Sequence, residues 1–142
     1  MPSPSTMTKP DKLALLNAAA EARRQAVAPY SRFQVGAALL TGEGVVIPGA
    51  NVESVSYGLT CCAERVALFR ALTSGERDFL AIAVVAAVEG GPTPCGACRQ
   101  LLAEYAPGAI VWTAHPDQLD QGREFSVAAL LPAAFAGFKP DR

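Results

Sequence analysis

The sequence lacks the features that nucleic-acid-coating and membrane proteins depend on. Its 12 Lys and Arg residues against 13 Asp and Glu leave a net charge of -1 over 142 residues. This balance argues against nucleic acid and membrane surfaces as partners, because both attract proteins with excess positive charge. Charged residues interrupt every apolar stretch before it reaches the ~18–20 residues of a membrane span. The residues before Lys12 are polar and have no apolar signal core. Together these absences favour a cytoplasmic protein.

Cysteine is also scarce, with four residues at Cys61, Cys62, Cys95 and Cys98. A chain of this length, 51% hydrophobic, can build a core without covalent staples, so the four do not indicate a disulfide framework. In a reducing compartment such cysteines more often bind metal or take part in chemistry. The single histidine, His115, falls in a polar stretch and is not an expected ligand.

The length favours one domain, which we place at residues 12–142, after a disordered or loosely attached arm at residues 1–11. Asp11 is a plausible helix N-cap, and Pro29 stops the helix that follows. The apolar patterns predict helices over 12–28, 62–72 and 96–105, strands over 35–40, 45–48, 80–88 and 109–113, and a short strand or helix within 125–134. This order of elements is typical of the α/β class.

Two of the predicted helices begin at cysteines. The helix over 62–72 leads into the strand at 80–88, and the helix over 96–105 leads out of it. If both crossovers have the usual right hand, the strands they link run parallel. Both helices then begin above the carboxyl ends of strands, where open α/β sheets place their sites. We therefore expect the cysteines at the two helix starts to meet at one edge of the sheet.

The spacing of these cysteines suits a metal ion with an open coordination position. Cys95 and Cys98 form a Cys-x-x-Cys pair, and Cys62 supplies a third thiolate. Three protein ligands leave a fourth position free, as in catalytic zinc sites. Glu64 lies on the first turn after Cys62, where it can act beside a metal-bound water. Two helix N-termini and Arg65 would offset the negative charge of the thiolates.

Two other interpretations stay open on spacing alone. A Cys-x-x-Cys pair can be a redox pair, although Cys62 and Glu64 would then be unexplained. All four cysteines can form a structural zinc site, but Cys61 and Cys62 point about 100° apart at a helix start. We therefore expect Cys61 to be a buried thiol outside the ligand set.

Several segments together resemble the small homotetrameric cytidine deaminases. Cys62-Ala63-Glu64 followed by Pro94-Cys95-Gly96-Ala97-Cys98 matches the zinc deaminase signature. The resemblance runs from about residue 12 to 138, and its segments are PYSRFQVGAAL (29–39), NVES (51–54), CAER (62–65), PCGACRQ (94–100) and LLPAAF (130–135). The chain departs from the family at Ser54, where Asn is common, and at Ala136, where Gly often follows the phenylalanine directly.

The resemblance implies a role for each matching residue. Cys62, Cys95 and Cys98 would hold one zinc ion per subunit, and Glu64 would move protons. Phe33 would pack against the pyrimidine, Asn51 and Glu53 would bind the ribose hydroxyls, and the backbone of Ala63 would contact the base. Tyr57 and Phe135 would contribute to a neighbouring subunit's pocket. Arg65 and Gln100 would support the thiolates. Taken singly, Phe33 and Phe135 are equally well explained as core residues, and Tyr57 as a surface residue.

The resemblance also implies the fold and the reaction. The fold is a three-layer α/β/α arrangement with a mixed, mostly five-stranded sheet. The reaction is zinc-dependent hydrolytic deamination of cytidine and 2′-deoxycytidine to the uridines plus ammonia, a step of pyrimidine salvage, in a homotetramer. Glu53, with no phosphate-binding loop nearby, favours a free nucleoside over a nucleotide. Two rivals remain: a deaminase for another aminopyrimidine, such as a blasticidin-type antibiotic, and a zinc-stabilised binding module without catalysis.

Overall fold

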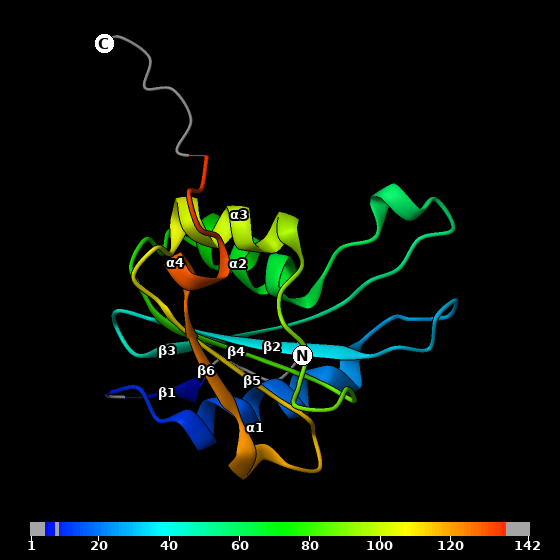
Figure 1. Ribbon diagram of the computed structural model, residues 1–142, viewed down its shortest axis with the longest axis horizontal. Helices are drawn as coiled ribbons and strands as arrows, with labels where there is room; N and C mark the ends of the chain where they lie inside the picture. Colours follow the sequence, from blue (N-terminus) through cyan, green and yellow to red (C-terminus); the bar gives the residue numbers. More distant parts are fainter. Residues whose placement is uncertain (1–4, 8, 136–142) are drawn as a thin grey trace, which may run out of the picture.

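One mixed β-sheet with helices on both faces organises the molecule (Figure 1). The computed structural model describes residues 5–7 and 9–135. The elements in chain order are β1 (Ser5–Thr6), α1 (Lys12–Ala22), the 3₁₀ turn η1 (Arg23–Gln25), β2 (Val35–Thr41), β3 (Val45–Ala50), η2 (Tyr57–Leu59), α2 (Ala63–Thr73), β4 (Phe79–Ala86), α3 (Gly96–Tyr105), β5 (Ile110–Ala114), η3 (Leu119–Gln121), β6 (Arg123–Ser126) and α4 (Val127–Leu130). None of the helices among the described residues has the length and apolar character needed to cross a membrane.

The strand order is β1-β3-β2-β4-β5-β6. The pair β4–β5 is parallel and every other neighbouring pair is antiparallel. Since β3 and β4 both run antiparallel to β2, they point the same way, as the predicted crossover through α2 requires. The α/β class and the mixed sheet of five main strands are therefore confirmed, and the two-residue β1 is added at one edge.

The layers follow from the apolar run in β4. Ile82 and Val84 pack in the core cluster beneath α2, α3 and α4, whereas Ala83 and Val85 pack in the cluster shared with α1. All four side chains are fully buried, which confirms the prediction of a central strand covered on both faces. In Figure 1, α1 lies on one face of the sheet and the other three helices lie on the opposite face.

Two glycines let helices approach the sheet closely. A Cβ atom on Gly49 in β3 would lie 2.5 Å from the backbone nitrogen of Ala67 in α2. A Cβ atom on Gly36 in β2 would overlap the carbonyl oxygen of Ala19 in α1. Gly49 therefore allows α2, the helix that begins beside Cys62, to pack closely against β3.

The N-terminal region differs from the expectation at two points. Part of the predicted loose arm is attached to the sheet, because Ser5–Thr6 pairs with β3. The first helix is shorter than 12–28: Val27 donates its N–H to the Asn51 carbonyl and so leaves the helical pattern. The predicted N-cap is present, with the Asp11 carboxylate accepting from the Ala14 N–H. Residues 1–4 and 8 of the arm, and residues 136–142 with the predicted departure at Ala136, lie outside the described residues.

Candidate active site

Two helix N-termini bring three cysteines together. Cys62 is the N-cap of α2 and Cys95 is the N-cap of α3, with Cys98 on the first turn of α3. The Sγ atoms of Cys62 and Cys95 are 3.7 Å apart, and those of Cys95 and Cys98 are 3.5 Å apart. All three sulfurs lie within 4.8 Å of one another, in a group that does not include Cys61. The juxtaposition expected from the sheet topology is confirmed.

These three thiols fit a zinc ion. Thiolate sulfur is a preferred zinc ligand, and the two helix N-termini present partial positive charge to the cluster. Arg65 adds to this charge, because its Nη2 donates to Cys62 Sγ at 3.5 Å and to the Thr60 carbonyl at 3.3 Å. Arg65 is therefore in contact with the Cys62 sulfur that it is predicted to support.

The thiols differ in how readily they ionise. A hydrogen bond from the Cys98 thiol, together with Arg65, lowers the pKa of Cys62 to about 5 although burial opposes this. The same bond and burial raise the pKa of Cys98 above its usual value. Cys62 is therefore ionised more readily than Cys98, and a metal ion bound by the group would displace the thiol proton of Cys98.

Glu64 is the second residue of α2, in its first turn, with only 5% of its surface exposed. Burial, with a smaller contribution from the neighbouring Cys62 thiolate, raises the pKa of Glu64 to about 7. A carboxyl group that changes protonation near neutral pH suits general acid–base catalysis. The structure therefore places a carboxyl group of raised pKa directly beside the thiol cluster.

A cavity of about 220 Å³ is lined by Cys62, Cys95 and Glu64. Phe33, Val35 and Val84 give it apolar walls, and Asn51 adds a polar group. Apolar walls with a few placed polar groups are typical of small-molecule sites. Phe33 is 41% exposed, so it is not simply a core residue.

Asn51 and Ala63 also line this cavity. Asn51 is buried and holds the chain around Phe33: its Oδ1 accepts from the Val35 N–H at 2.9 Å, and its Nδ2 donates to the Phe33 carbonyl at 2.9 Å. One further N–H and one lone pair of this amide remain for a ligand.

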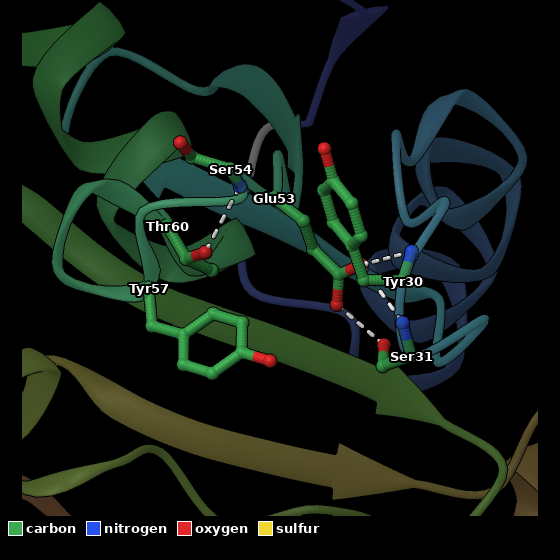
Figure 2. A pocket seen from close by; sticks show the side chains of 6 residues that line it. All are labelled: Tyr30, Ser31, Glu53, Ser54, Tyr57 and Thr60. Atoms are coloured by element: carbon green, nitrogen blue, oxygen red, sulfur yellow. Dashed lines mark hydrogen bonds between the residues drawn. The ribbon is translucent and has the colours of Figure 1, made fainter.

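A second cavity, of about 400 Å³, adjoins the first through Thr60, which lines both. Figure 2 shows the Glu53 side chain in this cavity between the rings of Tyr30 and Tyr57. Glu53 Oε1 accepts from the backbone N–H groups of Tyr30 and Ser31, at 3.0 and 3.1 Å, and Oε2 accepts from the Ser31 hydroxyl. The Ser31 bonds hold the pKa of Glu53 below its usual value, so the group is a carboxylate at neutral pH.

Two of the predicted residues lie away from the thiols. The Gln100 amide donates to Glu104 Oε1 at 3.1 Å and to the Phe135 carbonyl at 3.0 Å, so the expected support of a thiolate by Gln100 is wrong. The reason is helical geometry, because Gln100 is about 200° around α3 from Cys98. Phe135 is 71% exposed and lines a separate surface cavity with Tyr105.

Two residues make hydrogen bonds within or near the site that the sequence analysis did not predict. Arg99 joins two segments: its Nε donates to the Pro94 carbonyl at 2.7 Å, just before Cys95, and its Nη1 donates to the Leu130 carbonyl at 2.8 Å. Ser31 contacts Glu53 as described above. Both lie inside segments that carry the family resemblance, which was the available signal, but the sequence alone does not reveal these partners.

Comparisons with known proteins agree with this geometry. The family model described as the cytidine and deoxycytidylate deaminase zinc-binding region matches residues 9–114. A cytidine deaminase from Halalkalibacterium halodurans is 53% identical over 125 residues, covering 88% of this chain and 94% of that protein. The crystal structure of cytidine deaminase from Burkholderia pseudomallei superposes with a TM-score of 0.84 at 49% identity, covering 89% of this chain and all of that one. A blasticidin-S deaminase from Bacillus cereus is 33% identical over 89 residues, covering 57% of this chain and 64% of that protein.

The thiol cluster lies inside the region that the family model matches, and similarity to the first two proteins extends over most of the chain. This chain therefore belongs to the cytidine and deoxycytidylate deaminase family, in which the matched region binds zinc.

Proposed function

We propose that this protein hydrolyses cytidine and 2′-deoxycytidine to uridine and 2′-deoxyuridine, releasing ammonia. One observation carries the proposal: buried Glu64 and two of the three grouped thiols, Cys62 and Cys95, line a cavity that also presents Phe33. An aromatic wall can stack on a pyrimidine, and a proton carrier beside a metal site suits hydrolysis of its amino group.

Cys62, Cys95 and Cys98 would hold one zinc ion per chain. When bound, zinc supplies a Lewis acid that lowers the pKa of a water molecule towards neutrality. Glu64 takes the proton that the water loses as it attacks C4 of the base. Glu64 gives this proton to ring N3. It then takes the proton of the new C4 hydroxyl and passes it to the amino group, which leaves as ammonia as the C4–N bond breaks and the C4 carbonyl forms. Water is consumed and ammonia is released, so atoms and charge balance.

The two adjoining cavities would bind different parts of the nucleoside. The base would enter the cavity of Phe33 and Glu64, with the Ala63 backbone contacting it, and the sugar would extend towards Glu53 and Asn51. Carboxylate and amide oxygens can both accept hydrogen bonds from ribose hydroxyls.

Glu53 also favours a free nucleoside over a nucleotide. It is a carboxylate at neutral pH, and a substrate phosphate beside it would be repelled. We expect kcat/KM for 2′-deoxycytidine to exceed that for its 5′-monophosphate by at least about tenfold, which is the effect of roughly 1.4 kcal/mol. Equal turnover of the two compounds would contradict this specificity.

The working form would be a homotetramer. Tyr57, 83% exposed, and Phe135, 71% exposed, are large aromatic side chains that a single chain leaves open. In an assembly of copies each would be covered and would complete a neighbouring cavity. Light scattering coupled to size exclusion tests this, because an active monomer would overturn it. We place the enzyme in the cytoplasm and in pyrimidine salvage.

The rival substrate class is an aminopyrimidine antibiotic of the blasticidin type. The position of Glu53 in a cavity next to the base cavity favours a nucleoside sugar over the antibiotic's different substituent. A substrate panel separates the two, because the proposal predicts that cytidine has the higher kcat/KM.

The direct test is the ultraviolet spectrum of cytidine mixed with zinc-replete protein. Absorbance should move towards that of uridine over minutes, and Glu64→Ala should abolish the change. No change with folded, zinc-loaded protein would reject cytidine as substrate. Elemental analysis of the same samples shows whether the metal is present.

A further inference from the structure

A chain of hydrogen bonds joins the two cavities through one side chain, Ser31. Its hydroxyl donates to Glu53 Oε2, and its Oγ accepts from the backbone N–H of Phe33 at 2.9 Å. Phe33 lines the base cavity, whereas Glu53 lines the adjoining cavity. Figure 2 shows the Ser31 and Glu53 side chains pointing towards each other.

The direction of this chain is fixed by chemistry. A backbone N–H can only donate, and an ionised carboxylate can only accept. The group between Phe33 and Glu53 must therefore accept on one side and donate on the other. A hydroxyl does both with one atom, whereas alanine at this position does neither.

We propose that Ser31 is a positioning residue for substrate binding: it fixes the Glu53 carboxylate and the backbone of Phe33 in one arrangement, so that sugar and base are recognised together. This inference rests on the proposed function of the two cavities. Ser31 does not belong to the thiol cluster and does not reach Glu64, so its influence falls on substrate binding rather than on proton transfer.

The Glu53 carboxylate is held from one short segment of the chain. Its three hydrogen bonds among the described residues all come from Tyr30 and Ser31. The hydroxyl bond is the one among them that a side-chain substitution can remove.

The test compares Ser31→Ala, Ser31→Thr and the control Ser56→Ala. Ser56 is an exposed serine of the same segment as Glu53, and its hydroxyl makes no hydrogen bond with any described residue. Ser31→Ala should raise KM for cytidine by about tenfold, since a hydrogen bond to a charged group contributes at least about that factor. Its kcat and zinc content should stay within about twofold of wild type. Ser31→Thr, which keeps the hydroxyl, should restore most of the affinity.

Coupling to Glu53 gives a second readout. If Ser31 acts through Glu53, removing the hydroxyl from a Glu53→Gln background should raise KM by much less than it does in wild type. Additive effects would overturn the proposal. An unchanged KM in Ser31→Ala, a failure of Ser31→Thr to restore binding, or a loss of kcat together with zinc would each overturn it too.

The amide of Phe33 provides a measurement that does not need activity. In zinc-loaded protein without substrate, Ser31→Ala should speed hydrogen exchange at the Phe33 N–H by about tenfold or more, and Ser56→Ala should leave it unchanged. Unchanged exchange would overturn the positioning role. Faster exchange at the Phe33 N–H in a protein that fails to deaminate cytidine would instead reject the proposed function, while supporting the role of Ser31 in holding Phe33.

Discussion

The proposed site has a thiol end, formed by the three grouped cysteines and Glu64, and a sugar end, formed by Glu53 and Tyr57. The two ends are built differently. The thiols and Glu64 are held by the first turns of α2 and α3, two long helices packed on the sheet, and Glu64 is almost fully buried. Glu53 and Tyr57 come from connecting segments, and Tyr57 is largely exposed in the single chain. In the proposed function, the chemistry would therefore be contained in one chain, whereas the binding of the sugar would depend on connecting segments and on neighbouring copies.

This difference has a physical reason. Proton transfer needs groups fixed to a fraction of an ångström, and packed helices supply that precision. Substrate must enter and leave, which requires an open side lined by segments that can move. We therefore expect substitutions at the thiol end to lower kcat and substitutions at the sugar end to raise KM.

The largest effect should follow from removing a ligand. Cys95→Ala should lose zinc and reduce turnover to background, because two thiols are left to hold the ion. Cys61→Ala, outside the cluster, should keep both metal and turnover. Elemental analysis with a cytidine assay measures the two together, and full zinc occupancy in Cys95→Ala would refute the ligand set.

A loss of turnover without a loss of metal should follow at Glu64. Glu64→Gln keeps the size of the side chain but cannot carry the proton, so kcat should fall by about 10²–10⁴-fold. Zinc content should match wild type, since Glu64 is not among the three grouped ligands. Near-normal kcat would mean that another group moves the proton.

Two glycines at helix–sheet contacts provide a matched pair of substitutions, Gly49 facing α2 and Gly36 facing α1. Gly49→Ala pushes on α2 and Gly36→Ala pushes on α1, so each should destabilise the fold, by roughly 1–3 kcal/mol or more. Only Gly49→Ala should also lower kcat of the folded protein, because α2 carries Glu64. Thermal melts and kinetics below the melting range test this, and equal kcat losses in both would show that α1 matters as much to the site.

The smallest effect concerns the protonation of Glu53. Its pKa lies below the usual 4.5 because the Ser31 hydroxyl and backbone donate to the ionised form. The lowered pKa means that these bonds stabilise the folded protein above pH 4.5 and are lost as the pH falls through the lowered pKa. In Ser31→Ala the pKa should rise towards 4.5. Titration of the ¹³C-labelled Glu53 carboxyl by NMR measures it, and an unmoved midpoint would contradict the hydroxyl as a cause.

The sequence predicted the thiol end well because regular structure determined it. The apolar run over 80–88 and the helices on either side required a buried strand between two crossovers, and that topology brings Cys62 to Cys95. The covering of both faces of β4 followed from the same apolar run.

The sequence was less informative where side-chain direction depends on tertiary contacts. The partners of Gln100 follow from its place around α3 and from the path of the chain near Phe135. The contact of Ser31 with Glu53 joins segments that no periodicity relates. The early end of α1 follows from pairing of Val27 with the segment around Val52, which local propensity does not encode.

The most direct test of the division between the two ends is steady-state kinetics of cytidine deamination by Glu64→Gln and Glu53→Gln, measured side by side with wild type. We expect Glu64→Gln to lower kcat with little change in KM, and Glu53→Gln to raise KM with little change in kcat. A loss of kcat in Glu53→Gln as large as that in Glu64→Gln, with KM unchanged, would contradict it.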